Sequence, residues 1–201
     1  MAIQGSDEWL MERCGFATAS HFADILAKGQ GKTRAAYMRK LVAERITGRP
    51  RPTYSNGHMA RGNDQEPFAK IAYMAERGVV IDEVGFVRHP EIMAGASPDG
   101  LIGDDGGCEV KSVIAEVQIE TISKGGYPPE HKAQIQGNLW IHQRQWWDFI
   151  SFSDDMPDDL RLYVFRVERD DEYINELDAQ VRAFLSEVDA EVEKFLKIAR
   201  K

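Results

Sequence analysis

The sequence has few cysteines and no long apolar run, and each scarcity excludes a class of protein. Its 201 residues include only Cys14 and Cys108, far apart and outside any Cys-x-x-Cys spacing. Neither a disulfide framework nor a zinc or iron–sulfur site is therefore indicated. No apolar stretch approaches the roughly 20 residues of a membrane span, and the N-terminus lacks a signal-peptide pattern. We expect a cytoplasmic protein with no membrane partner, folded as one domain over residues 1–201.

Positive charge is also in deficit, since the formal net charge is −8. This balance argues against a protein that coats nucleic acid with its whole surface, because such binding draws on clustered cations. The positively charged residues are nevertheless unevenly distributed along the chain. One stretch has Glu44 as its single acid and contains these basic residues: Lys28, Lys32, Arg34, Arg39, Lys40, Arg45, Arg49, Arg51 and Arg61. The chain from Ser153 onward is rich in acids. Any contact with DNA is expected to be local, and the alternative is a solvated basic face.

Periodicity and capping signals predict helices first, a β-rich middle and a mixed end. A short helix is expected to begin at Ser6-Asp-Glu-Trp9, and further helices are expected at about 18–29, 33–47, 58–77, 129–142 and 172–198. A change to a period of two predicts a strand over 79–87 and β character as far as Val113, with a hairpin turn at 104–107. Further strands are expected at 145–152 and 160–167. This order predicts an α/β protein.

The segment Ser-Pro-Asp-Gly-Leu-Ile-Gly-Asp-Asp-Gly-Gly-Cys-Glu-Val-Lys, residues 97–111, holds the candidate chemistry. On a strand, Glu109 and Lys111 project from one face while Val110 points into the core. The hairpin lays Asp99 beside them, with the Val110 carbonyl at the edge. Such hard oxygen ligands suit Mg²⁺ or Mn²⁺, and a pair of these ions can cleave a phosphodiester. The alternative is a solvated strand with an ordinary ion pair.

The pattern Asp99…Glu109-Val-Lys111 resembles the signature of PD-(D/E)xK nucleases, and its Ser-Pro-Asp-Gly-Leu form resembles lambda exonuclease and its viral recombinase relatives. Further motifs follow the order of that family: Trp9…Arg13-x-Gly15-x-x-Thr18-Ala-Ser20, Gly62-x-x-x-Glu66 and Ala133-Gln-Ile-Gln136…Trp140. The resemblance covers residues 7–171. It implies a restriction-endonuclease-like core, in which helices flank a central mixed β-sheet.

The resemblance also implies the roles of single residues at the reaction centre. Lys111 matches the catalytic lysine. Gln134 matches a glutamine that approaches the lysine or the scissile phosphate. The implied metal ligands are Asp99, Glu109, the backbone carbonyl of Val110 and, through a water molecule, Glu66. An exposed helix acid and a helix-surface amide are the plainer interpretations of Glu66 and Gln134.

A second group of residues matches the positions that hold the 5′-terminal phosphate in the family, namely Arg13, Ser20 and Ser97. The chemistry agrees, because an arginine fork with hydroxyl donors recognises a phosphate dianion. The alternatives are a surface ion pair for Arg13 and simple caps for the serines. The sequence departs from the family at Val117, where a further arginine is expected. Either a nearby cation such as Lys124 substitutes, or the phosphate pocket is weaker.

Met59 matches an apolar residue that the family wedges between the bases of a duplex end, and ordinary packing is its alternative. The resemblance further implies a processive 5′→3′ exonuclease on double-stranded DNA ends, with two Mg²⁺ ions per site that Mn²⁺ can replace. Its product is a 3′ single strand for a phage annealing protein. The implied assembly is a homotrimeric ring, and a monomer or dimer is the alternative. Because the net charge of −8 would repel DNA, the basic stretch is expected to line the channel of such a ring and the acidic C-terminal segment to face outward. A specific endonuclease and an inactive module that binds DNA ends are the other hypotheses.

Overall fold

The structure is a computed structural model that describes residues 2–27, 31–51 and 57–199, while the side chains of residues 57–63 fall outside the description. Its helical elements are α1 (Asp7–Arg13), η1 (Ala19–His21), α2 (Phe22–Leu26), α3 (Lys32–Thr47), α4 (Gly57–Arg77), α5 (Ala115–Lys124), η2 (Pro129–His131), α6 (Lys132–His142), α7 (Asp158–Arg161) and α8 (Asp171–Ala199). Its strands are β1 (Ala17–Thr18), β2 (Val87–Arg88), β3 (Ala94–Ala96), β4 (Gly100–Ile102), β5 (Gly106–Ser112), β6 (Trp146–Phe152) and β7 (Leu162–Glu168).

The strands form two sheets. The larger one has four strands in the order β4-β5-β6-β7, and the smaller one has three in the order β1-β3-β2. In the larger sheet β5 and β6 run parallel, whereas β4 and β7 are antiparallel to their neighbours. The parallel register sets Glu109 opposite Phe149 and Lys111 opposite Ser151. The larger sheet is therefore mixed, and β5 is one of its inner strands.

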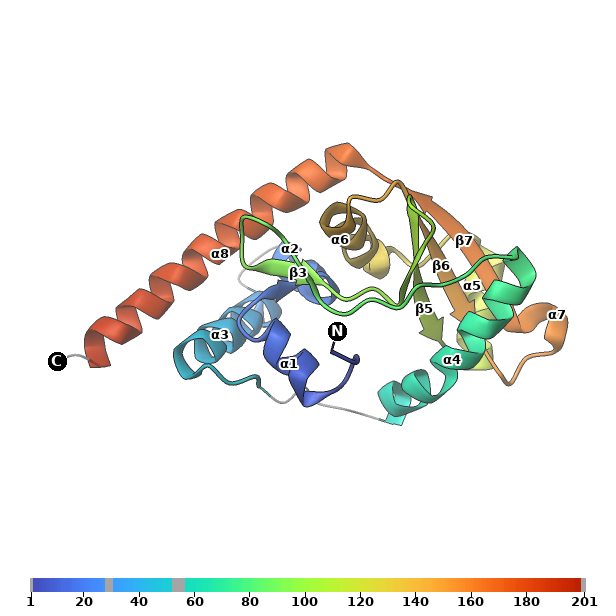
Figure 1. Cartoon of the computed structure of the whole chain (residues 1–201), viewed down its shortest axis with the longest axis horizontal. Helices are drawn as coiled ribbons and strands as arrows, with labels where there is room; N and C mark the ends of the chain where they lie inside the picture. The colour runs from blue at the N-terminus through green and yellow to red at the C-terminus, as the bar shows by residue number, and fades with distance from the viewer. Residues whose placement is uncertain (1, 28–30, 52–56, 200–201) are drawn as a thin grey trace.

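Helices cover both faces of the larger sheet, with α4 on one side and α6 on the other (Figure 1). Tyr73 of α4 packs with Cys108 and Val110 of β5 in one apolar cluster. Leu139 of α6 packs with Phe149 of β6 in another. Because successive strand residues face opposite sides, Glu109 and Lys111 of β5 project toward the α6 side.

The long helix α8 packs against α2, α3 and α6. Its apolar stripe includes Leu177, Val181 and Phe184, all fully buried in a cluster with Phe22 and Leu41. This stripe has the helical period of an amphipathic surface helix. Among the described residues, no helix has the length and apolar character needed to cross a membrane.

Most predicted elements are confirmed within a few residues, and the strand over residues 79–87 is the main error. Val80 is 71% exposed, whereas Val79 and Ile81 pack against the α4 cluster. The period of two is therefore real, but this extended chain meets the larger sheet through one bridge between Asp82 and Leu101, and only its last residue, Val87, belongs to a strand, β2 of the smaller sheet. Alternating burial does not by itself supply a ladder of hydrogen bonds. Helix α5 lies where no element was predicted.

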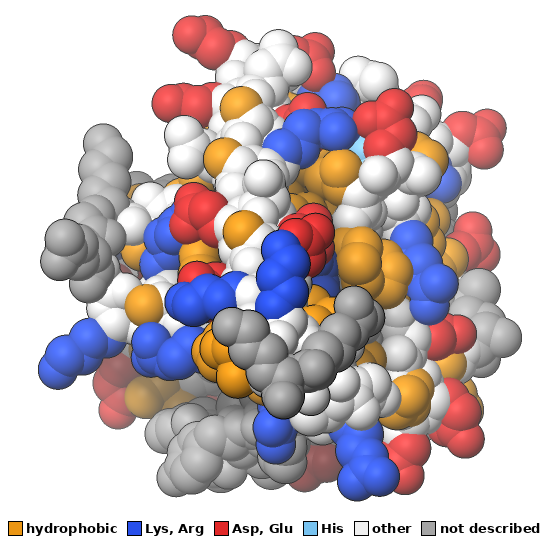
Figure 2. Space-filling view, turned by 90° about the vertical axis from the view of Figure 1, so that its left-hand side faces the viewer, with side chains coloured by type: hydrophobic (Ala, Val, Ile, Leu, Met, Phe, Trp, Pro, Cys, Tyr) orange, Lys and Arg blue, Asp and Glu red, His pale blue; other side chains and the backbone are white. Residues whose placement is uncertain are grey.

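The expected separation of basic and acidic segments is wrong where α3 meets α8. Arg34 forms a bidentate pair with Glu187, and Arg45 forms an ion pair with Asp189. On the face around the end of α8, Lys and Arg side chains lie interspersed with Asp and Glu (Figure 2). Part of the basic stretch is thus neutralised within the chain.

Candidate active site

The candidate site lies at an open edge of β5. Strand β4 follows β5 only as far as Cys108, which pairs with Gly100. Beyond that point the carboxylate of Asp99 replaces β4 as the hydrogen-bond partner of β5, because its Oδ2 accepts a hydrogen bond of 2.6 Å from the Val110 N–H. The N–H and C=O of a strand residue point to the same edge, so the Val110 carbonyl faces the side on which Asp99 lies.

Glu109 and Lys111 share a face of β5, as predicted. The Lys111 Nζ lies 2.5 Å from Glu109 Oε1, and Glu109 is 2% exposed. A carboxylate buried to this degree needs hydrogen-bond partners or a counter-ion to offset its desolvation. We name Asp99, Glu109, Lys111 and the Val110 carbonyl together the sheet-edge site.

Helix α6 supplies two amide donors to the same carboxylate. Gln134 Nε2 donates to Glu109 Oε1 at 2.6 Å, and Asn138 Nδ2 donates to Glu109 Oε2 at 3.3 Å. Gln134 therefore contacts the acid rather than Lys111. Sequence analysis missed Asn138, although its position four residues after Gln134 puts both side chains on one helix face.

Helix α4 brings a further acid and a second lysine. Glu66 pairs with Lys70 one turn later, with 2.7 Å between Oε1 and Nζ. The charge of Glu66 acts on both Asp99 and Lys111. Lys70 was not predicted as a site residue, and the only signal for it was its i, i+4 spacing from Glu66.

The buried charges shift the pKa values of the site. Burial, followed by the charges of Glu109 and Glu66, raises the pKa of Asp99 well above its usual range. Burial acts to lower the pKa of Lys111, but the charges of Glu109 and Asp99 outweigh it and raise that pKa. Burial and the charge of Lys111 lower the pKa of His131, just before α6, to about 4. The lysine is thus ammonium and the histidine neutral at neutral pH.

The donor set fits a hard divalent cation. Within the described residues, no group of three or more His, Cys, Asp or Glu side chains is arranged to hold a metal ion. The donors at the sheet-edge site are instead two carboxylates and one backbone carbonyl. Oxygen ligands of this kind, completed by water, are typical of Mg²⁺ and Mn²⁺.

A second group of side chains, which we call the arginine cluster, contains Trp9, Arg13, Ser20 and Ser97. Trp9 Nε1 donates to Ser97 Oγ at 2.9 Å, and the Arg13 guanidinium lies 3.8 Å above the indole. Arg13 also donates to Ser20 Oγ at 3.5 Å. The structure therefore brings together all three residues that the sequence assigned to phosphate binding, with Trp9 between them.

Arg13 forms no ion pair with a carboxylate in the described part of the chain. Burial lowers the pKa of Arg13 to about 10, although the nearby Tyr37 and Glu44 act to raise it. Near this arginine, Glu44 accepts a hydrogen bond of 2.9 Å from the Gly15 N–H, and Tyr37 accepts one of 3.0 Å from the Thr18 N–H. These buried contacts fix the backbone on either side of the cluster.

Three other predicted positions remain outside these two groups. Lys124 forms an ion pair with Glu120 on α5, so it is already occupied. Val117 is 40% exposed on the same helix. Met59 belongs to α4, but its side chain lies outside the described residues.

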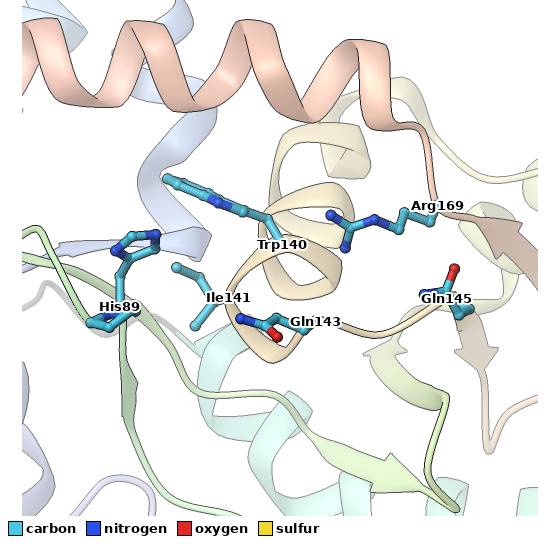
Figure 3. Close-up of a pocket in the computed structure, with 7 residues that line it drawn as sticks. His89, Trp140, Ile141, Gln143, Gln145 and Arg169 are labelled. Carbon is cyan, nitrogen blue, oxygen red and sulfur yellow. The ribbon is translucent and has the colours of Figure 1, made fainter.

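A cavity of about 410 Å³ lies at the other end of α6 from Gln134. His89 and Trp140 stand on one side of it and Arg169 on the other (Figure 3). The Arg169 guanidinium already donates to the carbonyls of Leu139 and Arg144. This cavity is therefore separate from the sheet-edge site, and its arginine is committed to the protein backbone.

Comparison with known proteins gives a consistent result. The model of the YqaJ-like viral recombinase domain matches residues 8–145. An alkaline exonuclease from Laribacter hongkongensis has a crystal structure with 41% identity and a TM-score of 0.91, covering 97% of this chain and 98% of that one. The same exonuclease in complex with dAMP gives equal values. No curated protein matches the chain.

A more distant structure bears on the fold alone. It is a phage-related exonuclease from Haemophilus somnus, with 17% identity and a TM-score of 0.67, covering 90% of this chain and 96% of that one. The predicted fold class is confirmed by these similarities and by the mixed sheet between helices.

Proposed function

The chain belongs to the family of YqaJ-like viral recombinase domains, whose relatives include an alkaline exonuclease, and from this premise we propose that it degrades one strand of duplex DNA from a 5′ end. The enzyme acts processively in the 5′→3′ direction and prefers a 5′-phosphorylated strand. It leaves 3′ single strands for a phage annealing protein, in the cytoplasm of a bacterial host.

The observation that carries this proposal is the closeness of the two groups of side chains along the chain. Ser97 of the arginine cluster and Asp99 of the sheet-edge site are separated by Pro98 alone. Two residue steps span at most about 7 Å, so the backbone at Ser97 lies close to the backbone at Asp99. A phosphate held by Ser97 and Arg13 thus leaves the next phosphodiester within reach of Asp99, which supports release of one nucleotide at a time. The dAMP bound by the Laribacter hongkongensis relative is such a product.

We assign the metal ions to the oxygen donors of the sheet-edge site. Asp99, Glu109 and the Val110 carbonyl would hold them, with Glu66 acting through water. When bound, two Mg²⁺ or Mn²⁺ ions polarise the scissile phosphate, activate the attacking water and neutralise the leaving oxygen.

The side chains of the chain itself position the reactants. Because the nearby carboxylates raise the pKa of Lys111, its ammonium group donates hydrogen bonds and orients the attacking water or the phosphate. Gln134 holds Glu109 by its 2.6 Å hydrogen bond, and its amide would also approach the scissile phosphate. Arg13, which forms no ion pair among the described residues, neutralises the terminal phosphate, while Ser20 and Ser97 donate hydroxyl hydrogens.

Two parts of the proposal concern assembly and the duplex end. A homotrimeric ring needs two different surfaces that meet head to tail. Exposed apolar side chains at opposite ends of the molecule suit such contacts: Phe68 and Ile71 on α4, and Phe195 and Ile198 near the end of α8 (Figure 1).

Met59 is the wedge that separates the last base pair. Residues 1–201 act as one exonuclease domain, since α8 packs against the helices that precede the sheet-edge site.

An assay with end-labelled DNA tests the function. We expect Mg²⁺-dependent nucleotide release from a linear duplex with a 5′-phosphate and none from a covalently closed circle. Cutting within the circle would favour the specific endonuclease. Binding of linear ends without cleavage in Mg²⁺ or Mn²⁺ would favour the inactive end-binding module.

A further inference from the structure

Asn138 stands out because it contacts the centre of the site and has no role in the function proposed above. Its Nδ2 lies 3.3 Å from Glu109 Oε2, while Gln134 and Lys111 both contact Oε1. Each oxygen of the Glu109 carboxylate therefore has its own amide donor. Removal of Asn138 would leave Oε2 without the only side-chain donor it has among the described residues.

Burial makes this contact matter. Glu109 is 2% exposed and Asn138 is 1% exposed, so water has little access to either group. The last side-chain torsion of a glutamate is intrinsically broad, and a carboxylate held at one oxygen can still rotate. A second donor on the other oxygen fixes the plane of the group. In such a dry site each hydrogen bond is strengthened, and a missing one is costly.

The chemistry of an amide suits this task. A neutral donor orients a carboxylate without cancelling its charge, whereas another cation would compete with the ions that the site attracts. The reverse orientation of the Asn138 amide would set its oxygen against Glu109 Oε2. The Asn138 Oδ1 therefore points elsewhere, and it has no partner among the described residues.

Helix α6 is held firmly enough to act as the support. Gly137 lies directly before Asn138, and a Cβ there would come within 2.5 Å of the Phe22 ring. Ile135 and Leu139 are fully buried against the sheet. The helix can neither rotate nor retreat without losing these contacts, so the position of Asn138 is set by the core.

We propose that Asn138 is a positioning residue, which fixes the plane of the Glu109 carboxylate so that its oxygens face the divalent cations at the sheet edge. This role rests on the proposed exonuclease function. Asn138 acts through Glu109 and does not itself touch the DNA or the reacting atoms.

The test compares Asn138→Leu with a matched control on the same helix. Gln136 is 1% exposed like Asn138, but its amide binds the Glu168 carbonyl and the Asp170 N–H, away from Glu109. The affinity for Mn²⁺ is measured by calorimetry without DNA, kcat and KM with a duplex, and stability by thermal unfolding. Asn138→Leu should weaken Mn²⁺ binding by roughly 10–100-fold and lower kcat with little change in KM for DNA. Gln136→Leu should lower the unfolding temperature and keep the wild-type Mn²⁺ affinity.

The outcomes separate the two proposals. A folded Asn138→Leu protein with wild-type Mn²⁺ affinity and kcat would overturn the positioning role and leave the exonuclease intact. A wild-type protein that neither binds Mn²⁺ nor cleaves DNA would remove the function itself. Should Asn138→Leu fail to fold, Asn138→Ser is measured in the same way, and wild-type affinity in that variant would equally overturn the role.

Discussion

The sheet-edge site and the arginine cluster handle buried charge in opposite ways. At the sheet edge, Glu109 is surrounded by Lys111 and two amides, and its charge is compensated inside the protein. In the arginine cluster, Arg13 lies over an indole with one hydroxyl partner, Ser20, and with no ion-paired carboxylate among the described residues. The first arrangement orients the carboxylate of Glu109, which can bind a cation. The second leaves the guanidinium of Arg13 able to bind an anion. In the proposed exonuclease, this difference indicates which part of a DNA end each group would receive.

The largest effect expected is the loss of cleavage when Lys111 is replaced. Lys111→Ala should lower kcat by a factor of roughly 10²–10⁴, the usual contribution of a positioned proton-bearing group. Binding of Mn²⁺ and of DNA should persist, because Asp99 and Glu109 remain. Single-turnover kinetics and calorimetry on the same sample measure both quantities. Near-normal turnover in Mg²⁺ would remove Lys111 from the reaction.

A smaller effect is expected at Arg13. In the wild type, a 5′-phosphate should speed digestion over a 5′-hydroxyl, and Arg13→Ala should abolish that preference. A lost charge-assisted contact of about 1.5–3 kcal/mol corresponds to roughly 10–100-fold. Arg34→Ala is the control, because Arg34 is already paired with Glu187. Equal rates on both ends in the wild type would contradict the phosphate pocket.

The pH dependence of stability probes the compensated site. The raised pKa of Asp99 means that the metal-free folded protein binds this proton at a higher pH than the unfolded chain does. The free energy of unfolding should therefore increase as the pH falls through the pKa of Asp99 in the folded protein. The increase should end once the pH is below the ordinary pKa of an aspartate, about 3.9. Asp99→Asn, which keeps an acceptor for the Val110 N–H, should remove this gain and be more stable than the wild type at pH 8. Thermal unfolding in EDTA measures the difference, on a scale of roughly 2–4 °C per kcal/mol. Identical pH profiles for the two proteins would contradict the raised pKa that burial and the charges of Glu109 and Glu66 give to Asp99.

The smallest effect expected is at the surface pair of α3 and α8. Arg34→Ala should change the free energy of unfolding by less than about 1 kcal/mol, since Glu187 is 50% exposed and such pairs are screened. Urea unfolding at low and high salt is the measurement. A larger loss would mean that α8 depends on this pair more than on its apolar stripe.

Local patterns in the sequence were sufficient to predict most of the helices and strands. Gly48 and Gly78 ended α3 and α4, and the alternation around Val110 correctly placed Glu109 and Lys111 on one face. Pairing was harder to predict, because the alternation of Val79 and Ile81 reports burial and not the hydrogen-bonded partner that a strand requires.

The contacts of the supporting residues could not be found from local patterns. The spacing from Gln134 places Asn138 on the same helix face, but its partner Glu109 lies 29 residues away in sequence, and Ser97, the partner of Trp9, lies 88 residues away. No spacing rule connects such distant positions. Lys70 is visible only as a common helix pair with Glu66. The reacting groups lie on one hairpin and are therefore close in sequence, whereas the residues that orient them come from separate helices that meet only in the folded chain.

The most direct test of the account is the length of the first product. A duplex labelled on its 5′-terminal phosphate is mixed with the protein and Mg²⁺, and the first labelled product is resolved by size. Because Ser97 and Asp99 are two residues apart, we predict a 5′-mononucleotide as that product, and no labelled product from the Lys111→Ala protein. A longer first oligonucleotide, or digestion that begins at the 3′ end, would contradict the coupling of end recognition to cleavage through residues 97–99.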